Sequence, residues 1–201
     1  MLQIDKRSTS KPETIVKLWI HESSRVFYDR LVNEEDRRWF TDLMTKMCLQ
    51  EFKRDWSHEE LFEKNTILFG DFMKSEDPEE QMYEEIEEID KLRVMATRYL
   101  DEYNDSNTSM NLVFFQSALV HLTRIVRILK LPRGNAMLVG VGGSGKQSLT
   151  RLASSMTRAS CFQITVTKTY NSAAFREDLK KLFLMAGGMD GAPVTFLMTD
   201  T

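Results

Sequence analysis

A glycine-rich loop at residues 140–148 constrains the fold of this chain more than any other feature. Gly140, Gly145 and Lys146 occupy the fixed positions of the phosphate-binding motif G-x-x-x-x-G-K. Glycine adopts backbone angles closed to other residues, so the N–H groups of such a loop can point at phosphates while the lysine reaches the β- and γ-phosphate oxygens. The residues predicted to bind nucleotide are Gly140, Val141, Gly142, Gly143, Ser144, Gly145, Lys146, Gln147 and Ser148.

The sequence on either side of the loop fits this prediction. Residues 136–139 are a short apolar run, which is typical of a buried parallel strand. After the loop, Leu149, Leu152, Ala153 and Met156 have helical spacing. The order strand, loop, helix is the required context, because the helix N-terminus adds free N–H groups and a favourable dipole to an anion site.

One position departs from the motif. The residue after Lys146 is expected to be Ser or Thr, whose hydroxyl binds Mg²⁺, but it is Gln147, and Ser148 comes one residue late. Successive helical residues point about 100° apart, so Ser148 does not simply replace the missing hydroxyl. We therefore expect nucleotide binding to survive this change better than hydrolysis, and we regard Mg²⁺ as a doubtful cofactor.

Composition favours an ordinary globular protein. The 201 residues carry a net charge of −3 and are 42% hydrophobic, and the mixed charges argue against a nucleic-acid surface. No apolar run approaches the roughly 20 residues that span a bilayer, and the first residues lack the apolar core of a signal peptide, so we expect a cytosolic protein without membrane contact. Cys48 and Cys161 are interpreted as buried reduced thiols, and His21, His58 and His121 as structural.

The first two-thirds of the chain predict helices. Apolar spacing favours helices at residues 12–32, from residue 34 onward, at 78–103 and at 112–130, with a short extended piece around Gly70. The polar stretch 104–109 is the best candidate for a linker.

The last third predicts alternating strands and helices, and hence an α/β fold with a parallel sheet. Strands are expected at residues 161–167 and 194–198, beside the phosphate loop, with a helix at 172–185 between them. The side chains expected to face inward from that helix are Phe175, Leu179, Leu182 and Phe183.

The third strand leads into Thr199-Asp200-Thr201, where a phosphate-loop NTPase carries its second acidic motif. If Asp200 is the ligand of Mg²⁺, Thr201 occupies the position of the water-orienting glutamate. If Asp200 occupies the glutamate position, Thr199 has replaced the magnesium ligand. A polar strand end without chemistry is the remaining alternative.

Taken together, these segments resemble the motor region of a dynein heavy chain, most closely the axonemal type. Two segments resemble the helical lid of the third AAA+ module, namely 18–31 and 67–72. Three others resemble the large subdomain of the fourth module, namely 140–149, 170–182 and 196–201.

The resemblance implies a division into three parts. These are a helical lid-type subdomain at 1–103, a linker with an amphipathic helix at 104–135, and the start of a phosphate-loop AAA+ large subdomain at 136–201. A complete AAA+ module needs further strands, a sensor and an arginine finger, so the resemblance implies a fragment of a motor. The main hydrolytic site, the microtubule-binding stalk and the linker element of the motor, which is distinct from the linker at 104–135, would lie elsewhere in the heavy chain.

Two functions from different classes follow. The first is a regulatory segment that binds ATP or ADP in a ciliary motor of the axoneme, in contact with the rest of the motor ring and other dynein subunits, and with microtubules only through the whole motor. The second is a structural docking segment that binds no nucleotide. A self-contained phosphate-loop kinase or GTPase would need a substrate lid or a base-reading motif, and neither is found. Arg25 is either a nucleotide-sensing lid arginine or a member of an ordinary ion pair.

Overall fold

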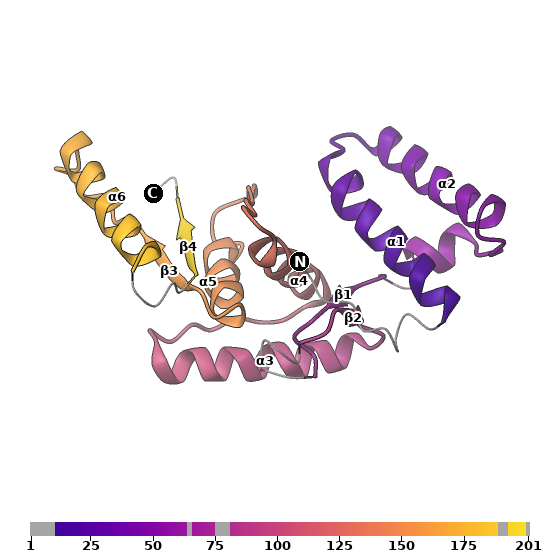
Figure 1. The fold of residues 1–201 in the computed structure, drawn as a ribbon, viewed down its shortest axis with the longest axis horizontal. Coiled ribbons are helices and arrows are strands. Elements are labelled where there is room, and N and C mark those ends of the chain that lie inside the picture. The colour runs from indigo at the N-terminus through magenta and orange to yellow at the C-terminus, as the bar shows by residue number, and fades with distance from the viewer. Residues whose placement is uncertain (1–10, 64–65, 75–80, 189–192, 200–201) are drawn as a thin grey trace. The chain divides into compact units, whose positions relative to one another are not determined.

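A computed structural model describes residues 11–63, 66–74, 81–188 and 193–199 (Figure 1). The chain divides into two compact units, Leu2–Leu92 and Arg93–Thr201. The division falls inside a helix, whereas the expected end of the lid-type part, residue 103, lies near the end of that helix, and the predicted boundaries remain a prediction. No helix in the described residues is both long enough and apolar enough to cross a membrane.

The first unit begins with two helices whose ends are set by their sequence. Helix α1 (Pro12–Val26) has proline in its first turn, where the missing N–H costs nothing. Helix α2 (Glu34–Gln50) starts at the cap Asn33, whose side chain accepts a 2.7 Å hydrogen bond from the Asp36 backbone N–H. The predicted helix 12–32 is therefore too long, because a 3₁₀ turn, η2 (Tyr28–Arg30), follows α1 before the extended approach to Asn33.

One face of each helix builds the core of this unit. The buried members are Val16, Ile20, Phe40, Met44, Cys48 and Leu61, the last from the short π-helix η3 (Glu59–Glu63). His21 is also buried, and its Nδ1 lies 3.0 Å from the Ile67 carbonyl oxygen while its Nε2 lies 3.1 Å from the Tyr83 hydroxyl. These contacts fit the structural role predicted for His21.

A short antiparallel pair joins two segments of the first unit. Strand β1 (Phe69–Gly70) pairs with β2 (Glu84–Glu85). A Cβ on Gly70 would lie 2.8 Å from the Phe72 ring, so glycine is needed for this close approach. The extended piece predicted around Gly70 is confirmed, but the helix predicted from residue 78 is wrong over 81–88, because pairing with β1 holds this acidic stretch extended and α3 (Ile89–Ser106) begins only at Ile89.

The polar stretch 104–109 predicted as a linker is helical in its first half, because α3 continues to Ser106, and the segment after the stretch is bonded to that helix. The Asn104 side chain accepts a 2.7 Å hydrogen bond from the Met110 N–H and donates a 3.0 Å bond to the Met110 carbonyl. Arg93, nearer the start of α3, donates from Nε to the Phe114 carbonyl at 3.1 Å. Residues 110–115 therefore run along α3 as an extended strap, and the helix predicted from residue 112 begins at Gln116 instead.

We expect Asn104→Ala to lower the free energy of unfolding of the second unit, Arg93–Thr201, by about 1–2 kcal/mol, because two hydrogen bonds to the backbone of Met110 are lost together. Urea denaturation followed by circular dichroism measures the change. Asn107→Ala is the matched control, since the Asn107 side chain donates to the Tyr103 carbonyl within the same helix end, at an exposed position. Equal destabilisation by both variants would show that Asn104 does not hold the strap.

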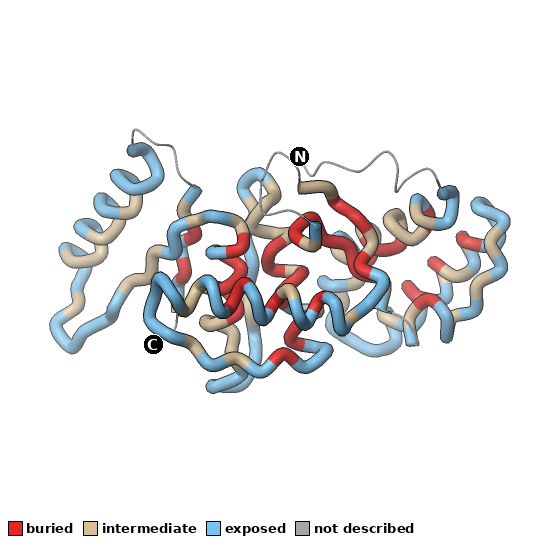
Figure 2. Tube along the Cα trace, turned by 90° about the horizontal axis from the view of Figure 1, so that it is seen from below, coloured by how far each residue is buried: buried red, intermediate tan, exposed pale blue. Residues whose placement is uncertain are grey.

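Two packed helices form the core of the second unit. Helix α4 (Gln116–Lys130) and helix α5 (Lys146–Met156) lie against each other, and Leu119, Leu122 and Leu152 are fully buried between apolar neighbours. Figure 2 shows buried residues in red along these helices. Because α5 starts at Lys146, this packing fixes the helix that follows the glycine-rich loop.

A parallel pair of strands completes the unit. Strand β3 (Ser160–Gln163) pairs in parallel with β4 (Val194–Leu197), and α6 (Ser172–Ala186) connects them. Helix α5 packs against both strands, as Figure 1 shows. The mixed α/β class predicted from the sequence, a helical part followed by a parallel sheet with flanking helices, is confirmed.

The strand predicted at 161–167 is too long, because β3 ends at Gln163, and two further predictions about this part are wrong. Residues 136–139 form no strand, and Met137 and Val139 are 90% and 88% exposed, because β3 and β4 pair with each other and not with this segment among the described residues. Phe183 is 69% exposed rather than inward, and no residue of α6 is buried. The tan and blue helix at the left of Figure 2 is α6, which has only a narrow contact with β4.

Candidate nucleotide-binding site

The loop 140–148 has the backbone that its glycines predict. Gly143 and Gly145 have φ angles of 74° and 77°, in the left-handed region where side chains cause strain. Gly145 caps α5, and its carbonyl accepts the Leu149 N–H at 2.8 Å. The start of α5 therefore follows the loop directly, with its free N–H groups at the loop end.

The Lys146 ammonium group bridges the loop. It donates to the carbonyl oxygens of Gly140 and Val141, both at 2.7 Å, and to the Ser144 hydroxyl at 3.2 Å. These bonds draw the first and last parts of the loop around a single positive charge. A phosphate oxygen that took Lys146 as a donor would replace some of these contacts.

Gln147 and Ser148 both lie in the first turn of α5, half-buried, without any local distortion of the helix. Ser148 therefore stays about 100° around the helix from the position that holds the magnesium-binding hydroxyl in the motif. The Thr150 hydroxyl is no substitute, because it donates to the Lys146 carbonyl at 2.8 Å. Asp200, the predicted metal ligand, lies outside the described residues.

A polar chain at the carboxyl ends of β3 and β4 was not predicted from the sequence. Arg151 of α5 donates to the Gln163 side-chain oxygen at 2.5 Å, and the Gln163 amide nitrogen lies 3.5 Å from the Thr199 hydroxyl. Ligands of open α/β sheets bind at this end of the strands. In the described residues no group of three or more His, Cys, Asp or Glu side chains is arranged to hold a metal ion.

The strap from residue 110 to 115 reaches the loop. The Leu112 Cδ2 atom lies 3.9 Å from the position that a Cβ would take on Gly145. The sequence pattern placed Leu112 in a helix, so this neighbour of the loop was missed as well. The polar pairing of Asn104 with Met110 was not visible as a spacing signal, because it joins a helix end to an irregular segment.

The segment before α6 is tied to that helix. The Tyr170 hydroxyl donates to the Asp178 carboxylate at 2.9 Å, and Lys181 pairs with the same carboxylate at 3.1 Å. The bond from Tyr170, followed by that from Lys181, lowers the pKa of Asp178. Desolvation, and then the bond to Asp178, raises the pKa of Tyr170.

The thiols differ in their surroundings. Cys48 is fully buried in the helical unit, as predicted, and burial raises the pKa of its thiol. Cys161 is exposed on β3, so the prediction of a second buried thiol is wrong, because β3 lies in a small sheet that α5 and α6 cover incompletely. Desolvation still raises the pKa of Cys161, partly opposed by the positive charge of Arg151.

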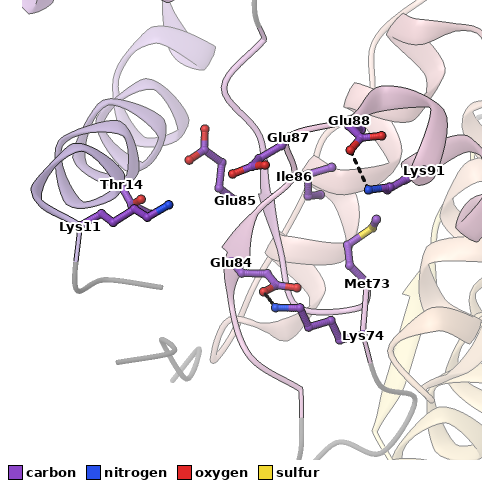
Figure 3. Close-up of a pocket in the computed structure, with 10 residues that line it drawn as sticks. All are labelled: Lys11, Thr14, Met73, Lys74, Glu84, Glu85, Ile86, Glu87, Glu88 and Lys91. Atoms are coloured by element: carbon purple, nitrogen blue, oxygen red, sulfur yellow. Dashed lines mark hydrogen bonds and ion pairs between the residues drawn. The ribbon is translucent and has the colours of Figure 1, made fainter. Parts of the chain in front are cut away.

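A separate cavity lies in the first unit, with a volume of about 550 Å³ (Figure 3). Its lining is highly charged and includes two ion pairs, Lys74 with Glu84 and Lys91 with Glu88, the latter at 2.6 Å. The hydrogen bond from Lys91 to Glu88 raises the pKa of Lys91. The cavity contains no residue of the phosphate loop and does not belong to the candidate site.

Known proteins resemble this chain over its whole length. A family model described as "P-loop containing dynein motor region D4" matches residues 110–201, and one described as "Dynein heavy chain, ATPase lid domain" matches residues 1–37. Dynein axonemal heavy chain 1 from Homo sapiens is 43% identical over 202 residues, which cover 100% of this chain and 5% of the relative. This chain belongs to the axonemal dynein heavy chains.

Other axonemal dynein heavy chains agree. Dynein axonemal heavy chain 6 from Homo sapiens is 42% identical over 100% of this chain and 5% of its own length. The flagellar outer arm dynein beta chain from Chlamydomonas reinhardtii is 44% identical over 94% of this chain and 4% of its own length. The chain thus spans about one-twentieth of the dynein heavy chains that it matches.

Within the lid-type part, the structure places Arg25 in a local ion pair. Its Nε lies 3.1 Å from the Asp29 carboxylate one turn along the chain, and its side chain is only 9% exposed. This is the ordinary structural alternative for Arg25, and no nucleotide-sensing role is proposed for it.

Proposed function

We propose that this chain is a nucleotide-binding, regulatory segment of an axonemal dynein heavy chain. ATP or ADP binds through Gly142, Gly143, Ser144, Gly145 and Lys146, with its phosphates at the start of α5. The observation that supports this most strongly is the loop closed around the Lys146 ammonium group, with two glycines in the left-handed region. Gln147 in place of the metal-binding hydroxyl residue favours a regulatory rather than a hydrolytic site.

The names of the relatives extend the proposal to the setting of the whole protein. We propose that the heavy chain acts in the axoneme of a cilium or flagellum as part of a microtubule motor. This segment would contact the remainder of the motor ring and other dynein subunits, and would meet microtubules only through the complete motor. Resemblance to axonemal and flagellar outer arm chains supports this setting.

The test is a Lys146→Ala variant. We expect it to weaken ATP and ADP binding about ten-fold or more, because a hydrogen bond to a charged group typically contributes about 1.5–3 kcal/mol. Isothermal titration calorimetry measures the affinities. Lys180→Ala, which removes an exposed cation of α6 paired with Glu177, is the matched control and should bind nucleotide as the wild type does. Equal affinity of the Lys146→Ala variant and the wild type would remove Lys146 from the site.

A docking segment without nucleotide remains the alternative. Phe183 and Leu184 of α6 are 69% and 76% exposed, which favours contact with another part of the motor. Thermal unfolding with and without nucleotide separates the two functions. A site that binds should stabilise the fold by about 2.7 kcal/mol at a hundred-fold excess over the dissociation constant, and a docking segment shows no shift.

A further inference from the structure

The face of α5 that follows Lys146 carries a second positive charge toward the strand ends. Gln147 and Arg151 are four residues apart, so they lie on one side of the helix about 6 Å apart along its axis. The Arg151 guanidinium bonds to Gln163, the last residue of β3, which shows that this side faces the strands. Helical side chains lean toward the helix N-terminus, so Arg151 extends back toward the loop.

This arrangement is unsuited to a divalent metal ion. Gln147 replaces the hydroxyl ligand, and the described side chains at the strand ends are an amide, Gln163, and a hydroxyl, Thr199. A guanidinium on the same side repels a dication and has no acceptor to offer it. Among the described residues, the donor set therefore does not fit Mg²⁺.

The same charge suits a polyphosphate. Arginine pairs with phosphate oxygens through a planar fork and keeps its charge at any physiological pH. Gln163 fixes the guanidinium through its side-chain oxygen, and Gln163 is itself within reach of Thr199 across the sheet. We propose that Arg151, oriented by Gln163, takes over the charge-compensating role of the metal ion, so that this site binds ATP or ADP without Mg²⁺.

The inference rests on the proposed function, and its test compares two conditions for each variant. ATP affinity is measured by calorimetry in EDTA and in excess Mg²⁺. The readout is the dissociation constant in EDTA divided by the dissociation constant in Mg²⁺. Partial loss of folding affects both constants alike, so the ratio stays informative for a destabilised variant. For the wild type we expect a ratio within about a factor of three of unity, a small difference on the free-energy scale of binding.

The variants identify the residue responsible. Arg151→Gln should weaken binding in EDTA about ten-fold and less in Mg²⁺, so its ratio rises. Arg151→Lys keeps the charge and should hold the ratio near that of the wild type. Arg176→Gln removes an exposed arginine of α6 and should leave the ratio unchanged.

The outcomes are distinct. A wild type that binds ATP only with Mg²⁺, or an Arg151→Gln ratio equal to that of the wild type, overturns the inference and leaves the proposed function standing. Absence of ATP binding in both conditions overturns the proposed function and the inference with it. A ratio near unity that rises only in Arg151→Gln supports both.

Discussion

The purified chain is expected to hydrolyse ATP negligibly, whatever its affinity for the nucleotide. Phosphoryl transfer depends on positioning and on stabilisation of charge around the transferred group. Gln147 cannot place a hydroxyl at the metal position, and the water-orienting acid of the second motif is absent or displaced at Asp200 and Thr201. Losing both contributions should lower the rate by many orders of magnitude relative to an active site of this type.

A coupled assay for phosphate release over hours measures this rate. Lys146→Ala controls for contaminating ATPases, because genuine turnover at this site needs the loop lysine. Turnover near once per second that disappears in Lys146→Ala would refute the prediction.

The largest effect on folding is expected from Leu152→Ala. Leu152 is fully buried on α5, the helix that packs against α4 and both strands of the sheet, so its truncation removes apolar contacts and leaves a cavity. Such substitutions typically cost about 2–5 kcal/mol of unfolding free energy. Urea denaturation measures the loss, and a lower midpoint with an unchanged slope would identify a change in stability alone.

Leu184→Ala is the matched control for Leu152→Ala. Leu184 is a leucine of α6 that is 76% exposed, and its truncation should change stability by less than about 0.5 kcal/mol. Similar losses for both variants would show that the buried side of α5 does not stabilise the second unit.

The elements with strong local signals could be predicted from the sequence. The loop glycines and Lys146 locate the loop and the start of α5, and Asn33 marks the start of α2. These features depend on residues that are close in sequence, where capping and helical spacing act directly. Helix α6 and strand β4 were also predicted near their observed positions.

The features that depend on distant partners could not be predicted. Acidic residues 81–88 have a helical composition, yet they are extended because β2 pairs with β1. The bonds of Asn104 to Met110 and of Arg151 to Gln163 join segments whose proximity is decided by packing. Likewise, residues 136–139 have the composition of a strand, but a strand also requires a partner at its edge.

The irregular, mostly exposed segment 136–139 leads directly into Gly140, the first residue of the glycine-rich loop. Among the described residues no strand pairs with this segment, and the bonds of Lys146 are what hold Gly140 to the start of α5. Any strand that paired with this segment would hold Gly140 in place and reduce the entropy lost when nucleotide binds. Thermodynamic linkage makes this effect reciprocal, so bound nucleotide would favour that strand pairing by the same free energy.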